Sequence, residues 1–256
     1  MDVSRIERIS SLQNPLMKVV KRAIQKGAAT EDGCLVAEGF HLLEEALTTG
    51  MKIEALIGTA QGLSGVGAVA DRILELPDSV YRDLSSMETP QGIMALVRGP
   101  QWDRKMLFEG NPLIVALDSV QDPGNAGTIL RSAEAFGATA VFALRGTVDF
   151  ANPKVLRASA GSIFRLPVFR GELSELKLTL YGAAGDSGDT GKLAKDVDWR
   201  GPCAIVIGSE GQGLSEAVRK ATQPVRIPTQ GVESLNAAIA AAVFLYEAAR
   251  QRGEAG

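Results

Sequence analysis

Apolar positions in the second half of the chain follow two alternating patterns. Short continuous apolar runs predict buried strands, and the segments between them repeat their apolar residues every three or four positions, as amphipathic helices do. The predicted strands are residues 113–117, 140–144, 178–181, 204–207 and 225–227. The predicted helices are residues 122–136, 153–163, 214–221 and 234–250. Strands that alternate with helices are typical of a parallel sheet with helices on both faces, so we expect a three-layer α/β domain.

The N-terminal part of the chain alternates in the same way but on a smaller scale. A helix is predicted over 14–25, with Asn14 as its cap and Pro15 in its first turn. The other predicted elements are strands at 34–37, 53–57, 73–76 and 93–97 and helices at 40–47 and 78–84. We therefore expect a second, smaller α/β domain.

Glycine, proline and charged residues are mixed between two apolar strands at residues 99–112. Such composition is typical of a linker between domains. It predicts an N-terminal domain at 1–98, a linker at 99–112 and a C-terminal domain at 113–256. A second Gly-rich stretch, residues 182–191, predicts a surface loop.

The composition narrows the class of protein. Of 256 residues, 45% are hydrophobic and 22% are charged, which is typical of a globular protein and excludes a mostly disordered chain. The cysteines Cys34 and Cys203 are too few for a disulfide scaffold and fit a reducing compartment. With one histidine, His41, they also argue against a His/Cys metal cage, so no metal site is expected.

No segment of the sequence predicts a signal peptide or a membrane-spanning helix. The N-terminal residues are polar and lack the apolar core of a signal peptide, and the most apolar stretch, 235–245, is too short to span a bilayer. We expect a cytoplasmic protein. Its net charge is −3, so any surface that binds nucleic acid must be a local one.

Ligands of parallel α/β sheets bind beyond the carboxyl ends of the strands, so the loops there are the candidate sites. The first loop, 118–131, leads into a helix and contains Asn125 and Arg131. These residues could be a helix-end amide and a surface cation. Alternatively, the amide and the guanidinium could face a phosphorylated substrate at a helix N-terminus.

The second candidate loop, 208–213, holds three glycines, which let a backbone approach a ligand closely. It lacks the lysine of a P-loop and does not match the dinucleotide fingerprint. An ordinary loop remains the alternative. Glu210 disfavours a phosphate cradle and favours a cationic or hydroxyl-bearing ligand.

Two further segments carry candidate residues. In 227–236, Ser234 could simply cap the last helix, with Asn236 in its first turn. That role does not explain a loop of proline, glycine and polar residues placed after an apolar strand. In 154–162, small residues surround Lys154 and Arg157, which suits either tight helix packing or contact with a polyanion.

Taken in order, four motifs resemble those of the SpoU (TrmH-like) RNA 2′-O-ribose methyltransferases, which belong to the SPOUT class. The motifs are DPGNAGTILRSAEAFGA, KVLRASAGSIFRLPV, IVIGSEGQGLS and IPTQGVESLNAAIAAAVFLYEA, and the resemblance covers about residues 113–250. The segments SLQNPLMKVVKRA, CLVAEGFHLLEEAL and ETPQGIMALV resemble the substrate-binding domain that many members carry, which is similar to small α/β ribosomal proteins that bind RNA.

The resemblance implies a deep trefoil knot, an S-adenosyl-L-methionine cofactor and a homodimer in which both subunits line the site. The residues that it implies for catalysis are Asn125, Arg131, Glu210, Ser234 and Asn236. The residues that it implies for cofactor binding are Leu144, Gly208, Glu210, Gly213, Ile227, Pro228 and Leu235. The third motif departs from the family pattern, because Thr229 replaces a methionine, its loop is one residue shorter and Ala237 stands where valine is common.

Cations near the N-terminus favour an RNA substrate. The first 26 residues contain six lysines and arginines against two carboxylates, although a solvated charged face is the simpler interpretation. The residues expected to bind RNA are Arg5, Lys18, Lys21, Arg22 and Arg157. We expect 23S ribosomal RNA as the substrate, with tRNA methylation or a non-catalytic RNA-binding role as alternatives. A Rossmann-type reductase is disfavoured, because its glycine fingerprint is missing after the first strand.

Residues 235–245 leave little polar face on the predicted last helix. A helix that is apolar all round is buried on most sides. It could be buried within the fold or at a subunit interface, and the resemblance favours the interface.

Overall fold

The computed structural model describes residues 6–67, 69–184, 191–232 and 234–253. Its contacts group the chain into two compact units, which are described separately. The first unit comprises Met1–Gln101 and Asp149–Phe164, and the second comprises Trp102–Val148 and Arg165–Gly256. In the part of the chain described, no helix is long and apolar enough to cross a membrane.

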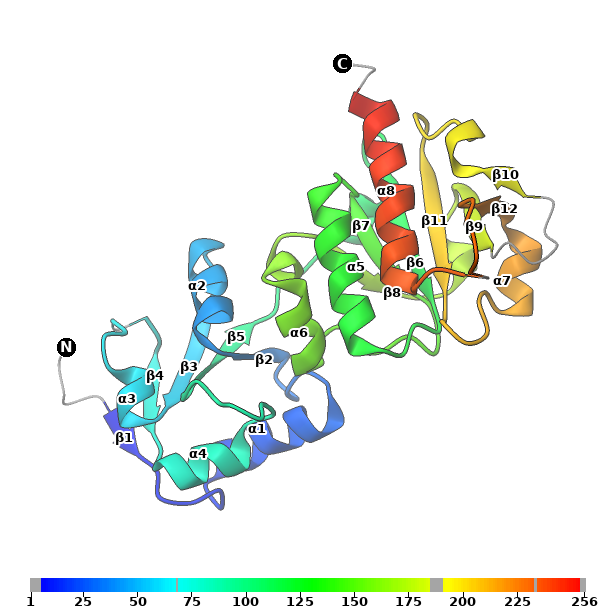
Figure 1. The fold of residues 1–256 in the computed structure, drawn as a ribbon. Helices are drawn as coiled ribbons and strands as arrows, with labels where there is room; N and C mark the ends of the chain where they lie inside the picture. Colours follow the sequence, from blue (N-terminus) through cyan, green and yellow to red (C-terminus); the bar gives the residue numbers. More distant parts are fainter. Residues whose placement is uncertain (1–5, 68, 185–190, 233, 254–256) are drawn as a thin grey trace. The chain divides into compact units, whose positions relative to one another are not determined.

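The first unit is built on a five-stranded mixed sheet with the order β1-β4-β3-β5-β2 (Figure 1). Its strands are β1 Ile6–Arg8, β2 Cys34–Glu38, β3 Ile53–Gly58, β4 Arg72–Glu75 and β5 Ile93–Arg98. Strands β1, β4 and β3 are parallel, and β5 runs antiparallel to both β3 and β2. The small α/β domain expected from the sequence is therefore confirmed.

Helices cover both faces of this sheet. They are α1 Pro15–Lys26, α2 Phe40–Thr48, α3 Ala60–Leu63, α4 Asp78–Leu84 and α6 Pro153–Ser159. Helices α1 and α4 supply Met17, Val20 and Leu84 to the core on one face. Helices α2, α3 and α6 contact the strands as well, α2 and α6 both against β2. Asn14 caps α1 as expected, since its side chain accepts a hydrogen bond from the Leu16 N–H.

The second unit contains a seven-stranded sheet with the order β10-β12-β9-β11-β6-β7-β8, in which all the pairs are parallel. The strands are β6 Leu113–Asp118, β7 Ala140–Ala143, β8 Val168–Arg170, β9 Thr179–Ala184, β10 Lys192–Leu193, β11 Cys203–Gly208 and β12 Gln223–Arg226. The central strands β6 and β11 are almost entirely buried, as their continuous apolar runs predicted. The expected parallel sheet is confirmed.

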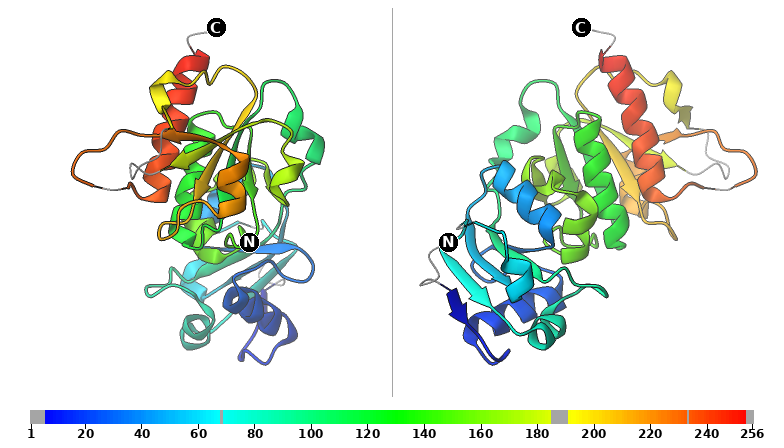
Figure 2. Two further views of the ribbon diagram at one scale, coloured as in Figure 1. Left: turned by 90° about the vertical axis from the view of Figure 1, so that its right-hand side faces the viewer. Right: turned by 60° about the vertical axis from the view of Figure 1, so that its left-hand side comes forward.

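Three layers form around this sheet. Helices α5 Pro123–Ala135 and α8 Ala237–Gly253 lie side by side on one face, as Figures 1 and 2 show. On the other face lie α7 Glu216–Ala221 and the short helices η2 Arg104–Phe108 and η4 Leu173–Glu175. The short helix η5 Ala194–Asp196 contacts α8. Residues of η2, α7 and the sheet share one core, to which Leu107, Phe142 and Val218 belong.

Several element boundaries differ from those expected. The helix predicted to run to residue 163 ends at Ser159, because Ala160 and Gly161 adopt left-handed backbone angles, and a short helix η3 Ser162–Phe164 follows. The last helix begins at Ala237 instead of Ser234. The loop expected at 182–191 is replaced by β9 as far as Ala184, and its residues 185–190 lie outside the described part.

The expected domain boundaries remain a prediction. Within the expected linker, residues 104–108 form η2, whose Leu107 is buried in the core of the second unit. Residues 149–164, expected in the C-terminal domain, group with the first unit. These observations describe how the residues pack. The expected boundaries instead separate a domain that binds RNA from a domain that transfers the methyl group.

Candidate active site

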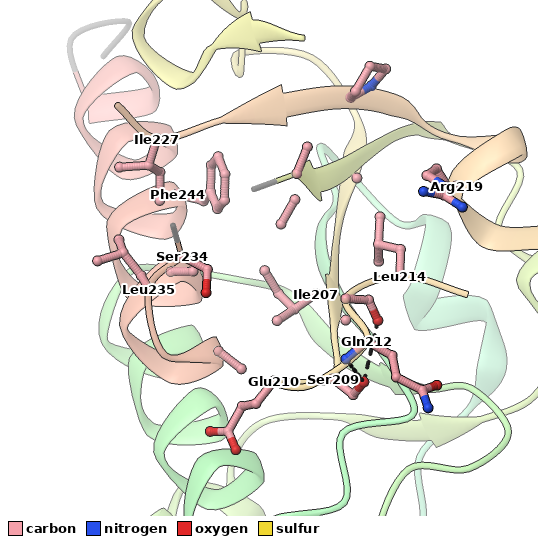
Figure 3. A pocket seen from close by; sticks show the side chains of 18 of the residues that line it. Ile207, Ser209, Glu210, Gln212, Leu214, Arg219, Ile227, Ser234, Leu235 and Phe244 are labelled. Atoms are coloured by element: carbon pink, nitrogen blue, oxygen red, sulfur yellow. Dashed lines mark hydrogen bonds between the residues drawn. The ribbon is translucent and has the colours of Figure 1, made fainter. Parts of the chain in front are cut away.

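A cavity of about 440 Å³ opens at the carboxyl ends of β9 and β11 in the second unit (Figure 3). Ile207, Ile227, Leu235 and Phe244 form much of its apolar lining. Polar side chains at its rim include Ser209, Glu210, Gln212, Arg219, Thr222, Thr229 and Ser234. An apolar cavity with a few polar groups at its rim is typical of a site for a small organic ligand.

The Gly-rich loop after β11, residues 208–213, lines this cavity and forms a tight turn. Ser209 and Gly213 exchange two backbone hydrogen bonds of 3.0 and 2.9 Å. A Cβ atom at Gly208 would lie only 2.2 Å from the carbonyl carbon of Gly213, so no larger residue fits there without moving the loop. The glycine is therefore needed for the close approach of two backbone segments.

Three side chains from distant segments meet beside the cavity, and one of them, Glu210, lines it. Glu210 Oε1 accepts hydrogen bonds from Asn125 Nδ2 and from Asn236 Nδ2, the latter at 2.8 Å. Asn236 Nδ2 also donates to Asn125 Oδ1 at 3.0 Å. The three residues come from α5, from the loop after β11 and from the residue before α8. All three are among the residues expected from the sequence, and in the structure they are in direct contact.

Local structure fixes the two asparagines. Asp122 caps α5 by accepting the Asn125 N–H at 2.7 Å, which holds Asn125 in the first turn. Asn236 caps α8 instead of Ser234, because its Oδ1 accepts the N–H groups of Ala238 and Ile239. Ser234 lines the cavity and is exposed.

Most of the residues expected to bind a cofactor line this cavity. They are Gly208, Glu210, Gly213, Ile227 and Leu235. Pro228 is exposed and is not among the lining residues. Leu144 lines a second cavity of about 490 Å³, near Asp118, Arg145 and Ser215.

Arg131 does not join the cluster at the cavity. It lies on the exposed side of α5, and among the described residues its side chain has no hydrogen-bond or ion-pair partner. Its guanidinium is therefore available to an external group.

The expected RNA-binding residues fall into three groups. Arg5 lies outside the described residues. On α1, Lys18 is exposed and Lys21 partly exposed, neither with a charged partner in the described chain, while Arg22 pairs with Glu31 at 3.0 Å. Arg157 is turned inward, donating to Ser86 Oγ at 2.8 Å and lying 3.5 Å from the fully buried carboxylate of Glu38.

Sequence reasoning missed two side chains near the cavities. Asp118 is 4% exposed, and its carboxylate accepts the Ser215 N–H at 2.6 Å, which ties the end of β6 to the segment before α7. Its position at a strand end could have drawn attention to it. Arg219 lines the first cavity from α7, a helix that no motif marked for function.

Comparisons with known proteins identify the family of this chain. Residues 112–246 match the model of the SpoU rRNA methylase family, and residues 14–95 match that of the MRM3-like substrate-binding domain. The chain belongs to the SpoU family. It is an RNA 2′-O-ribose methyltransferase that uses S-adenosyl-L-methionine.

Relatives match over nearly the whole length of this SpoU enzyme. The 23S rRNA (guanosine(2553)-2′-O)-methyltransferase RlmP of Bacillus subtilis is 32% identical, covering 94% of this chain and 98% of the relative. The 23S rRNA (guanosine-2′-O-)-methyltransferase RlmB of Xylella fastidiosa is 33% identical, covering 95% and 93%. The AdoMet-bound rRNA methyltransferase of Sinorhizobium meliloti has a TM-score of 0.80 at 29% identity, covering 96% and 98%.

The lining of the first cavity fits the methyl donor chemically. Ile227, Leu235 and Phe244 offer an apolar surface of the kind that an adenine ring requires. The Glu210 carboxylate at the rim is complementary to a positively charged sulfonium or ammonium group. No group in this lining is in conflict with such a ligand.

Proposed function

We propose that this SpoU enzyme methylates a ribose 2′-hydroxyl in 23S ribosomal RNA, at the cavity end formed by Asn125, Glu210 and Asn236. The observation that carries the proposal is the hydrogen-bonded contact of these three side chains beside the cavity. The names of RlmP and RlmB support ribosomal RNA and a guanosine target. Such a substrate is consistent with a cytoplasmic location.

When bound, S-adenosyl-L-methionine supplies a methyl group that is already activated by its sulfonium. The residues must therefore position the ribose hydroxyl in line with the S–CH₃ bond, and positioning alone can contribute several kcal/mol. The hydroxyl proton leaves to water or to a phosphate oxygen of the RNA as the methyl group is transferred and the thioether S-adenosyl-L-homocysteine is released. In our proposal Asn125 and Asn236 hold the hydroxyl and the donor in line, and Glu210 fixes both amides. Ser234, exposed at the rim, offers a further hydroxyl for hydrogen bonding.

Arg131 acts as a fixed cation in this proposal. A guanidinium stays protonated at physiological pH, so it is a poor general base. Its unpaired state in the described chain suits a role in which it binds the phosphate of the target nucleotide and stabilises the developing alkoxide.

We further propose that two copies of the chain pair through α8 and α5. Ile239, Val243 and Tyr246 form an exposed apolar stripe along α8, being 53%, 37% and 58% exposed. The Tyr246 ring packs edge-on against Phe136 at the end of α5, so the stripe continues toward the helix that carries Arg131. Pairing along this surface would bring Arg131 of one chain to the cavity of the other chain. This would explain why Arg131 does not contact Asn125, Glu210 or Asn236 within a single chain.

In this proposal the N-terminal domain binds the RNA, and Lys18 and Lys21 on α1 contact its phosphates. Family membership also implies the trefoil knot in the C-terminal domain. Binding through phosphate contacts should weaken steeply as the salt concentration rises. Arg157 contributes only if it leaves its internal partners Glu38 and Ser86.

The test is transfer of a labelled methyl group to RNA, followed by mapping of the modified ribose. We expect the purified protein to label 23S rRNA at one ribose and to leave tRNA unlabelled. Arg131→Ala should reduce the rate by about 100-fold or more, as removal of a charge-stabilising donor does in other enzymes. Label that appears in tRNA, or on a base, would refute the proposed substrate.

A further inference from the structure

The cavity contains one positively charged side chain that the family motifs do not account for. Arg219 lies on α7 and lines the cavity, and Figure 3 shows it on the side away from Ser234 and Leu235. Among the described residues its guanidinium has no hydrogen-bond or ion-pair partner. This cation is therefore available to a ligand in the cavity.

The backbone around Arg219 is held firmly. Val218, the preceding residue, is buried in the core beneath α7, and the Arg219 N–H donates to the Ser215 carbonyl at 2.8 Å. Thr222 Oγ1 in turn donates to the Arg219 carbonyl. The side chain thus projects from a fixed point on the rim, although its own tip is free.

The charges of the cavity match those of the methyl donor. Glu210 provides a carboxylate at one part of the rim and Arg219 a guanidinium at another. S-adenosyl-L-methionine carries two positive groups, the sulfonium and the ammonium, and one carboxylate. A guanidinium binds a carboxylate strongly, often through two parallel hydrogen bonds.

We propose that Arg219 binds the α-carboxylate of the methionine portion of the donor and so selects the intact donor over fragments that lack this group. The inference rests on the cavity being the donor site. Arg219 is then a cofactor-binding residue outside the four motifs. The apolar residues would bind the adenosine portion without its help.

The neighbouring cation provides a matched control. Lys220 stands next to Arg219 on the same helix, is 73% exposed, pairs with Glu216 at 2.6 Å and does not line the cavity. Lys220→Ala therefore removes the same charge from the same helix without touching the cavity.

The experiment is calorimetric titration of the full chain with S-adenosyl-L-methionine and with 5′-methylthioadenosine, which lacks the amino-acid portion. We expect Arg219→Ala to weaken binding of S-adenosyl-L-methionine by about tenfold or more and to leave methylthioadenosine binding within about twofold, since hydrogen bonds to charged groups have this magnitude. Arg219→Lys should lose less than Arg219→Ala, and Lys220→Ala should match the wild type for both ligands. Thermal unfolding of all variants should agree, because the side chains are exposed.

Two results would overturn the inference. One is unchanged binding of S-adenosyl-L-methionine to Arg219→Ala, which includes the case where Arg219 contacts RNA phosphate instead. The other is an equal loss for both ligands, which would assign Arg219 to the adenosine portion or to the shape of the cavity. If the wild type itself does not bind S-adenosyl-L-methionine, the cavity is not the donor site, and the proposed function fails rather than the role of Arg219 alone.

Discussion

Two glycines of the loop after β11, Gly208 and Gly211, differ in whether a larger residue would fit in their place. At Gly208 a Cβ atom would clash with the backbone of Gly213, whereas at Gly211 nothing lies within 4 Å of the same atom. Both glycines belong to the same motif and both line the cavity. Only the first is required by packing.

This difference predicts the effect of two similar substitutions. Gly208→Ala should open the loop between Ser209 and Gly213 and weaken binding of S-adenosyl-L-methionine by at least about tenfold, because backbone atoms cannot yield as a flexible side chain can. Gly211→Ala should bind the donor like the wild type. Calorimetric titration measures both, and equal affinities for the two variants would contradict the assigned role of Gly208.

The family motifs led to three side chains that the structure places in contact. Asn125, Glu210 and Asn236 were selected because their types and positions fit known motifs, but their mutual contact depends on the tertiary fold. Arg219 escaped notice because a lone arginine on a short helix is usually a solvated charge. Its place in the cavity lining and the lack of an ion-pair partner among the described residues distinguish it from Lys220, which pairs with Glu216.

Among the single elements, α6 is held by buried apolar side chains such as Val155 and Leu156 and also by an ion pair to a buried carboxylate. Glu38, at the end of β2, has a fully buried side chain whose carboxylate accepts hydrogen bonds from Ser85 and Ser86. Arg157 of α6 supplies the only cation within 4 Å of that carboxylate among the described residues. Nearby, burial and the Glu38 charge raise the pKa of Tyr81.

Removal of this cation should therefore destabilise the protein. We expect Arg157→Ala to lower the free energy of unfolding by about 2 kcal/mol, because a buried carboxylate loses its compensating charge but keeps its serine partners. Lys154→Ala, on the exposed side of the same helix, should change it by less than about 0.5 kcal/mol. Chemical unfolding followed by circular dichroism measures both.

A double variant separates charge from packing. Adding Glu38→Gln to Arg157→Ala removes the unpaired charge and should recover part of the lost stability. If the double variant unfolds with a lower free energy than Arg157→Ala, the two substitutions act independently, and the ion pair between Glu38 and Arg157 does not contribute to the stability.

Element types were predictable from apolar periodicity, but their ends were not. The apolar pattern of 153–163 continues past Ser159, while the left-handed angles of Ala160 and Gly161 interrupt the helix. Short edge strands such as β1, β8 and β10 have too few residues to show a period, so the sequence did not reveal them. The start of α8 depended on which polar residue accepts the free N–H groups, and Asn236 does so instead of Ser234.

For the molecule as a whole, the exposed apolar face of α8 supports the proposal that two chains form a dimer. The apolar pattern of this helix left two possibilities open, burial within the fold or burial against a second chain. In the structure Ala241, Phe244 and Leu245 are buried, while Ile239, Val243 and Tyr246 remain exposed. The helix therefore has one face for the core and another available to a partner. Sequence periodicity could not separate these faces because both are apolar.

A charge placed on the exposed face should prevent pairing without harming the fold. Ile239→Glu should convert a dimer to a monomer in sedimentation analysis at micromolar concentration, and methyl transfer should fall with it if Arg131 serves the partner's cavity. Phe108→Glu, at an apolar residue that is 45% exposed on η2, is the matched control and should stay dimeric. A wild-type monomer, or a dimer that tolerates Ile239→Glu, would contradict pairing through α8.

The central claim is that the cavity beside Asn125, Glu210 and Asn236 holds the methyl donor. A crystal structure of the protein with S-adenosyl-L-homocysteine, the demethylated product, tests it most directly. We predict the adenine against Ile227 and Leu235, with the sulfur toward the three-residue cluster. Density for the ligand in the second cavity near Leu144, or none at any site under saturating conditions, would contradict the account.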